Sequence, residues 1–221
     1  MNSIHDLGGM HGMGSLPFET NEPLFREDWE RSAFAITILL IVSGVFKADE
    51  HRYASERIPP LHWLGSPYYL RWLAGSARLL IEKGYATVDE VTSGQQDSSF
   101  QGRAAPNFVE AYEVRSIATT NHPVTGDAAG APRFKVGDKV RAKNMHPKTH
   151  TRLPRYVRGR AGTITAHPGA FLYADARAQG ADNVAQHTYS VRFEGAELWG
   201  PDAGPRDAVY IDLYDTYLEP V

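Results

Sequence analysis

Four arginines lie within one short segment, residues 150–162, and no other side chains in this sequence have a clearer capacity for chemistry. They are Arg152, Arg155, Arg158 and Arg160. A guanidinium stays protonated and offers several N–H donors in a planar fork, which suits it to binding oxygen-rich anions. Four positive charges at this spacing also repel one another. We therefore expect an anionic or oxygen-rich group to contact at least one of them.

The residues around this segment predict that a small β structure carries it as a loop. Residues 134–141 have the pattern of a turn that leads into a strand, and residues 163–166 return to strand. Pro147 and Pro154 interrupt regular structure between the two. Alternation along the first strand predicts one buried and one exposed face. The side chains expected to point inward are Val136, Val140 and Ala142, and those expected to point outward are Lys139, Arg141 and Lys143.

Three helices are predicted in the first half of the chain. The first begins at Glu27 or Asp28 and ends near Gly44, the second spans residues 49–57, and the third runs from Ser66-Pro67 to Gly84. On the third helix, Tyr68 and Trp72 share one face, whereas Tyr69, Leu73 and Leu80 share another. Two apolar stripes exceed what one small core requires, so we expect one of them to face a pocket or a partner.

Strands dominate the second half, with alternating segments at residues 188–193, 208–213 and 216–219. Short strands separated by Gly, Pro and Asp turns predict a small, partly open barrel of the SH3-like kind, and helices followed by strands indicate an α+β fold. The predicted divisions are an extended arm at 1–26, a helical domain at 27–90, a linker at 91–133 with a short helix around 107–114, and the barrel at 134–221.

Composition excludes several classes of protein. The chain has 221 residues, a net charge of -3 and no cysteine, so it holds no disulfide and no thiolate metal site. His5 and His11 have irregular spacing and no carboxylate cluster, and we predict no metal ligand in this chain. The longest apolar run, Ala33–Phe46, is shorter than the ~20 residues of a membrane span. The N-terminus lacks the features of a signal peptide, so we expect a cytoplasmic protein.

Each candidate residue also has an ordinary structural explanation. Arg52 has one acidic residue three positions before it and another four positions after it, which is the spacing of a surface ion pair on a helix. Arg152 is explained equally well as a solvated charge, and Tyr68 and Trp72 as core residues. No Ser–His–Asp set and no phosphate-binding glycine loop is recognisable.

A basic stretch leaves a rival function open. Residues 133–160 carry many lysines and arginines, and Asp138 is their only acid. A basic barrel of this kind can bind RNA through its phosphates. Aromatic residues for base stacking are limited there to Phe134 and Tyr156, which weakens this interpretation.

Motifs from both ends of the chain resemble the nitrile hydratase beta-subunit family, and they occur in the family's order. They are residues 1–9, 50–57, 67–69, 81–84, 134–138, 150–156, 158–160, 162–163, 197–200 and 217–220. The linker, residues 91–133, carries no such motif. The resemblance implies an enzyme that hydrates a nitrile to an amide, and a small nitrile as substrate.

The resemblance also implies a partner and a metal that this chain does not hold. In this family a low-spin Fe(III) or Co(III) is bound by cysteine sulfurs and backbone amides of an alpha subunit, and two of those cysteines are oxidised. The positions that match the two arginines contacting the oxidised sulfurs are Arg52 and Arg152. The expected assembly is a heterodimer or a dimer of heterodimers, with neither a membrane nor a nucleic acid as partner.

By the same resemblance, four residues should line the channel for the nitrile: Ala48, His51, Tyr68 and Trp72. Tyr68 is expected to place a hydroxyl near the reacting groups, and Trp72 to form an apolar wall. Relatives often carry a larger apolar residue in place of Ala48, and Phe or Val in place of His51. We therefore expect a roomier and more polar entrance in this chain.

Overall fold

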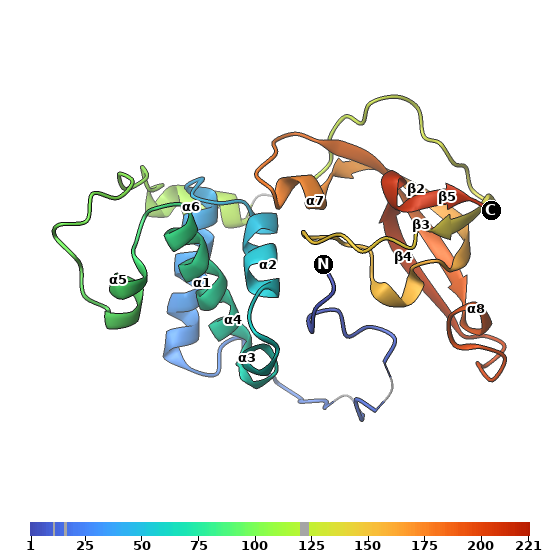
Figure 1. The fold of residues 1–221 in the computed structure, drawn as a ribbon, viewed down its shortest axis with the longest axis horizontal. Helices are drawn as coiled ribbons and strands as arrows, with labels where there is room; N and C mark the ends of the chain where they lie inside the picture. The colour runs from blue at the N-terminus through green and yellow to red at the C-terminus, as the bar shows by residue number, and fades with distance from the viewer. Residues whose placement is uncertain (11, 16, 120–123) are drawn as a thin grey trace. The chain divides into compact units, whose positions relative to one another are not determined.

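The chain folds into two compact units (Figure 1). The computed structural model describes residues 1–10, 12–15, 17–119 and 124–221. The helical unit comprises Ser3–His5 and His11–His122, and the sheet unit comprises Met1–Asn2, Asp6–Met10 and Pro123–Val221. His11, considered above as a metal ligand, lies outside the described residues. An N-terminal helical part and a C-terminal antiparallel sheet together make the mixed class that the sequence predicts.

Short helices, several of them delimited by proline, build the helical unit. They are α1 (Asp28–Val42), α2 (Ala48–Glu56), α3 (Pro60–Gly65), α4 (Tyr68–Glu82), α5 (Val88–Ser93) and α6 (Ala111–Thr119). The three helices predicted from caps and periodicity are confirmed as α1, α2 and α4, each to within about two residues at either end. The predicted helix around 107–114 overlaps α6 only in part. The short helices α3 and α5 were not predicted.

A close approach between α2 and α4 holds the helical unit together. An added Cβ at Gly75 would lie 2.4 Å from Ser55 Oγ and 3.2 Å from His51 Nε2, so only glycine fits without a shift. Between α1 and α4, the buried hydroxyls of Thr37 and Ser76 share a hydrogen bond of 3.0 Å. The core is formed by Leu40, Val45, Phe46, Ala54 and Leu79. This packing fixes the facing sides of α2 and α4, which carry the predicted channel residues.

The sheet unit is a five-stranded antiparallel sheet in the order β4-β3-β2-β1-β5 (Figure 1). Its strands are β1 (Lys139–Ala142), β2 (Ala161–Leu172), β3 (Ala185–Glu194), β4 (Ala208–Tyr214) and β5 (Leu218–Pro220). Helices α7 (Ala174–Arg177) and α8 (Gly195–Trp199) and the 3-10 turns η1 (Arg155–Val157) and η2 (Asp215–Tyr217) lie between them. Its largest completely buried side chains include Tyr189, Tyr217, Phe193 and Leu153.

One residue of the first predicted strand is wrongly placed by the alternation pattern. Val140 and Ala142 are completely buried as expected, but Val136 is 62% exposed. The reason is a turn, in which Asp138 N–H donates to the Lys135 carbonyl at 3.1 Å and Gly137 has a φ of +95°. The strand begins only at Lys139, so the period-two rule does not extend back to Val136.

Among the described residues, no helix combines the length and the apolar character that a membrane crossing requires.

Candidate functional site

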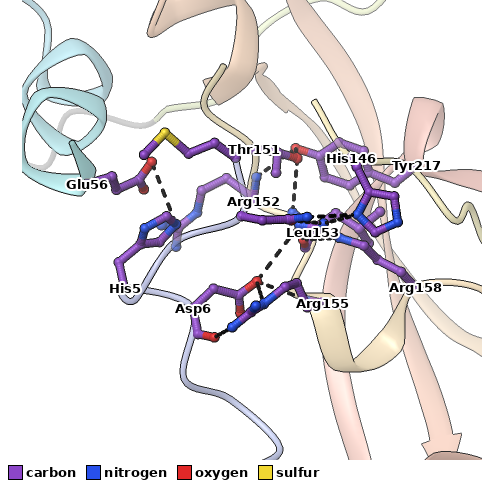
Figure 2. Close-up of polar contacts among 12 residues, drawn as sticks. His5, Asp6, Glu56, His146, Thr151, Arg152, Leu153, Arg155, Arg158 and Tyr217 are labelled. Carbon is purple, nitrogen blue, oxygen red and sulfur yellow. Dashed lines mark hydrogen bonds and ion pairs between the residues drawn. The ribbon is translucent and has the colours of Figure 1, made fainter. Parts of the chain in front are cut away.

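Asp6, an acidic residue of the same unit, contacts the loop with the four arginines and is one of the oxygen-rich groups expected there. Asp6 accepts a hydrogen bond from the backbone N–H of Arg155 at 2.9 Å, and its backbone carbonyl accepts one from Arg155 Nη2 at 2.8 Å (Figure 2). The Asp6 carboxylate also lies 3.8 Å from Arg158 Nη2. Asp6 therefore contacts two of the four arginines and balances one of their positive charges.

Arg158 is the most deeply enclosed of the four. Only 2% of its side chain is exposed, and its Nη2 donates to the Leu153 carbonyl at 2.8 Å (Figure 2). Its Nη1 contacts the side chains of Asn2 and His146. Burial lowers the pKa of Arg158, and the nearby Asp6 carboxylate opposes that effect. Arg158 thus organises the loop from inside and is not available to an external ligand.

The arm lies close against this loop because it carries glycine there. An added Cβ at Gly8 would lie 2.8 Å from the Tyr156 ring, and one at Gly9 would lie 2.6 Å from Tyr156 Cβ. Burial raises the pKa of the Tyr156 phenol. The arm residues of the sheet unit therefore pack on the arginine loop of their own chain.

Arg152 differs from Arg155 and Arg158, which both contact Asp6. Its side chain is exposed, and within the described part of its own unit the guanidinium has no hydrogen-bond or ion-pair partner. Its backbone, in contrast, is firmly held, because its N–H donates to the Tyr217 phenol at 3.0 Å. The flanking residues Thr151 and Leu153 are buried. The structure therefore presents the Arg152 guanidinium to the outside from a fixed backbone. Arg160, the fourth arginine, is also exposed.

A buried tyrosine–aspartate pair supports that backbone. The Tyr217 phenol accepts hydrogen bonds from Arg152 N–H and Thr151 Oγ1 (Figure 2). It donates one to the Asp175 carboxylate. Tyr173 donates to the other oxygen of the same carboxylate at 3.1 Å. Burial, followed by the charge of Asp175, raises the pKa of Tyr217 far above that of a free phenol. Burial likewise raises the pKa of Tyr173 to about 12. Both phenols therefore keep their protons and remain donors.

Arg52 lies on α2 in the helical unit, with about half of its side chain exposed. Its Nη1 contacts Asp49 Oδ1 at 2.8 Å, so the ion pair expected from the helical spacing forms with the preceding acid. The following acid, Glu56, lies 3.9 Å from His5 Nε2 instead. Asp49 is buried and fixes one edge of the guanidinium. The exposed part of the fork keeps further N–H donors for another group.

The four predicted channel residues lie on the facing helices α2 and α4. Tyr68 is 60% exposed, and its ring centroid lies 5.7 Å from that of Trp72. The Trp72 ring lies 5.6 Å from the His51 ring, and the Trp72 carbonyl accepts a hydrogen bond from His51 Nε2 at 2.9 Å. Ala48 stands at the first position of α2 and is half-buried. Tyr68, Trp72 and His51 therefore form one continuous aromatic group.

His51 is held as a neutral, oriented ring. It stacks on Phe46 with a centroid distance of 5.7 Å and an interplanar angle of 14°. Burial lowers the pKa of His51, and the adjacent positive charge of Arg52 lowers it further, against the effect of the Trp72 carbonyl. The imidazole therefore presents a polar but uncharged surface beside Trp72.

The two faces expected on α4 are not separate. Tyr69 contacts both Tyr68, at 5.1 Å, and Trp72, at 5.7 Å. Phe25 and Phe34 extend the same group, because each packs against Tyr69. The contribution of Phe25 was not predicted, since it precedes the first helix and has no place in a helical pattern.

Two supports of the arginine loop were also missed. Asp6 is the first acidic residue of the chain, and Tyr217 is part of the closing motif, but neither position reveals its partner. The Asp6–Arg155 and Tyr217–Arg152 contacts span 149 and 65 residues. Among the described residues there is no group of three or more histidines and acids placed to hold a metal ion.

Comparison with known proteins gives the family. The family model "Nitrile hydratase beta subunit, N-terminal" matches residues 1–131, and the model "Nitrile hydratase beta subunit, C-terminal" matches residues 123–220. The nitrile hydratase subunit beta of Pseudomonas putida is 40% identical over 221 residues, which is 100% of both chains. The low-molecular weight cobalt-containing nitrile hydratase subunit beta of Rhodococcus rhodochrous is 38% identical, again over 100% of both chains.

A solved structure also matches in part. It is the recombinant apo-enzyme of thiocyanate hydrolase from Thiobacillus thioparus, with a TM-score of 0.43 and 26% identity over 53% of this chain and 100% of that chain. The rival RNA-binding function finds no support in these matches, which are to enzyme subunits. Two family models cover the chain from residue 1 to residue 220, and relatives match it at full length. The chain belongs to the nitrile hydratase beta-subunit family, whose enzyme hydrates nitriles to amides.

Proposed function

We propose that this chain is the beta half of a heteromeric nitrile hydratase and completes a metal site that lies in its alpha-subunit partner. The absence of cysteine and, among the described residues, of any three-residue ligand group fits a chain that does not hold the metal itself. When bound in the partner, Fe(III) or Co(III) would supply Lewis acidity to the nitrile or to water. The residues of this chain bind and orient the groups around that reaction.

Arg152 is assigned to an oxidised cysteine of the partner, and one observation carries this assignment. Two of its neighbours, Arg155 and Arg158, are engaged with Asp6, whereas the Arg152 guanidinium is exposed on a backbone held by Tyr217. A sulfinate or sulfenate oxygen buried at a subunit interface requires charge-assisted donors, because an unpaired buried anion is costly. Arg152 is built to supply them without a loop rearrangement.

Arg52 is assigned the same role from the helical unit. Its contact with the buried Asp49 carboxylate uses part of the guanidinium and orients the remainder. The free N–H groups would then donate to a second sulfur-bound oxygen of the partner. Lysine retains the charge but loses the fork, so it cannot hold Asp49 and an external oxygen in the same geometry.

The nitrile channel is assigned to Ala48, His51, Tyr68 and Trp72. The exposed hydroxyl of Tyr68 would donate to or accept from the reacting groups, while Trp72 excludes water from one side. His51 adds an uncharged polar surface, since burial lowers its pKa. The small side chain of Ala48 leaves space at the start of α2.

We also propose the type of barrel, the domain boundaries and the assembly. The order β4-β3-β2-β1-β5, with β1 between β2 and β5 and a 3-10 turn before β5, supports a partly open SH3-like barrel. We keep the divisions 1–26, 27–90, 91–133 and 134–221 as arm, helical domain, linker and barrel. The proposed assembly is a cytoplasmic heterodimer or a dimer of heterodimers that acts on small nitriles.

The test is co-expression of this chain with the adjacent reading frames and purification through a tag on this chain alone. We expect a cysteine-containing partner to co-purify with near-stoichiometric iron or cobalt and to form amide from a simple nitrile. Thiocyanate is assayed in parallel as the comparison substrate. Turnover of thiocyanate without amide formation would reject the proposed substrate, and a metal-free chain that elutes alone with RNA would reject the proposed function.

A further inference from the structure

Two histidines outside the proposed nitrile site lie side by side on neighbouring strands. His167, in β2, and His187, in β3, have ring centroids 5.1 Å apart. His167 Nε2 is 3.1 Å from His187 Nδ1, and both side chains are accessible to solvent. Neither residue contacts the arginine loop or belongs to the channel group.

A β-bulge brings the two rings together. The pairing of β2 with β3 shifts between Ala166 and Gly169, so His167 and Pro168 together face a single residue of β3. Bulges of this kind redirect a side chain from its regular direction. The His167 ring is supported there by the buried Tyr189 ring, at a centroid distance of 5.2 Å. The position of the His167 side chain is therefore set by the bulge in the sheet and by its contact with Tyr189.

The hydrogen bonds of the pair define where its lone pair points. His187 Nε2 lies 3.1 Å from the Gly130 carbonyl, which can only accept, so this nitrogen carries the proton. The lone pair on Nδ1 of neutral His187 then accepts the hydrogen bond from His167 Nε2 at 3.1 Å. Metal-binding histidines commonly donate their second ring N–H to a backbone carbonyl in this way, which fixes the ligating tautomer.

We propose that His167 and His187 bind one divalent transition cation of the zinc, nickel or copper class. Metal–nitrogen bonds of 2.0–2.1 Å at tetrahedral or square geometry place neighbouring ligand nitrogens about 2.9–3.4 Å apart, and the observed separation of 3.1 Å falls within that range. On binding, the His167–His187 hydrogen bond is lost and the rings turn so that both lone pairs point at the cation. His167 moves its proton from Nε2 to Nδ1, so both rings stay neutral and no net proton is released.

The two imidazole ligands determine which metal ions the site prefers and how tightly it binds them. Two imidazoles favour zinc, nickel or copper over magnesium or calcium, which prefer oxygen ligands. Because no group of three such ligands occurs in the described part of the chain, water fills the remaining positions. A cation at this position would link β2 to β3 across the bulge and stabilise the sheet unit by mass action.

The test uses the complete complex and Zn²⁺ in equilibrium dialysis, with the zinc per complex counted above the resident metal. The variants are His167→Gln, His187→Gln and both together, and His62→Gln, an exposed histidine of α3, is the matched control. We expect each single variant to lower the Zn²⁺ affinity about tenfold or more and the control to leave it unchanged. Mg²⁺ should not compete.

A second measurement uses the unaltered complex, so its result does not depend on whether the variants fold. Cu²⁺ is added to the complex, and pulsed EPR is recorded at the Cu²⁺ signal. The spectrum should show two imidazole rings coordinated to this Cu²⁺. Zinc uptake that is absent, or that is equal in the double variant and the wild type, would overturn the proposal. A Cu²⁺ signal with one imidazole or none would overturn it as well.

Discussion

The backbone N–H of Arg152 donates a 3.0 Å hydrogen bond to the Tyr217 phenol, which is completely buried. The phenol in turn donates to Asp175, whose carboxylate is also buried. An exposed guanidinium therefore projects from a backbone that is anchored to a core tyrosine and a buried charge. The position of the Arg152 backbone therefore depends on two buried residues of the sheet unit.

Removal of the Tyr217 hydroxyl should destabilise the loop from inside. Tyr217→Phe removes one hydrogen-bond partner from each of three groups: the N–H of Arg152, the hydroxyl of Thr151 and the carboxylate of Asp175. Such losses in a buried site cost about 2–4 kcal/mol in the free energy of unfolding. Denaturant unfolding of the complex measures this. Tyr210→Phe, at an exposed tyrosine of β4, is the control and should unfold like the wild type. Equal stability of both variants would contradict the anchoring role.

Replacement of the two proposed contact arginines should affect turnover more than assembly. Arg52→Lys and Arg152→Lys keep the charge but lose the planar fork, and we expect each to lower kcat by about 10- to 100-fold. Steady-state kinetics gives the rate, and analytical ultracentrifugation tests whether the heteromer is intact.

Arg160→Lys is the matched control for that experiment, because Arg160 lies in the same loop and is also exposed. It should turn over nitrile at the wild-type rate. Normal turnover in all three variants would remove Arg52 and Arg152 from the mechanism, and an equal loss in all three would show that the effect is not specific to the two proposed contact arginines.

The contact between α2 and α4 should be sensitive to a single methyl group. Gly75→Ala places a Cβ 2.4 Å from Ser55 Oγ and 3.2 Å from His51 Nε2, so the two helices must separate or His51 must turn. We expect a loss of about 1–3 kcal/mol in the free energy of unfolding, and a changed ratio of rates for small and bulky nitriles. Gly65→Ala in α3 meets no atom within 4 Å and should leave both quantities unchanged.

A larger residue at the start of α2 should narrow the entrance. Ala48→Leu is expected to lower the rate with bulky aromatic nitriles relative to a small aliphatic nitrile, because the half-buried Ala48 leaves space beside His51. The ratio of kcat/KM values for the two substrates measures the change. The same ratio in wild type and variant would show that Ala48 does not line the route.

The sequence predicted a helix well where capping residues or proline lie next to its periodic apolar residues. The capping box of Glu27 and Glu30 and the Ser66-Pro67 step define where α1 and α4 begin. The six-residue helices α3 and α5 are too short for a reliable period, and the turn at Gly137 interrupts an alternation that seemed to include Val136.

The sequence could not show which of the loop arginines are engaged, because their partners lie far away along the chain. The four loop arginines look alike in sequence, and their contacts with Asp6 distinguish Arg155 and Arg158 from Arg152. A contact across 149 residues leaves no trace in local spacing. The resemblance to a family selected Arg152 for functional reasons, and the packing of its neighbours supplies a physical reason for the same choice.

The sequence distances within the arginine loop have a consequence for biosynthesis. Its supports are Asp6 and Tyr217, which lie 149 and 65 residues from the loop residues that they contact. A ribosome adds about 5–20 residues per second, and contacts between distant residues form late because long loops must close first. The loop therefore acquires its shape only when the segment containing Tyr217 has left the ribosome. A nascent chain that still lacks Tyr217 has no phenol to accept the hydrogen bond from the Arg152 N–H, so the backbone of Arg152 is not yet anchored.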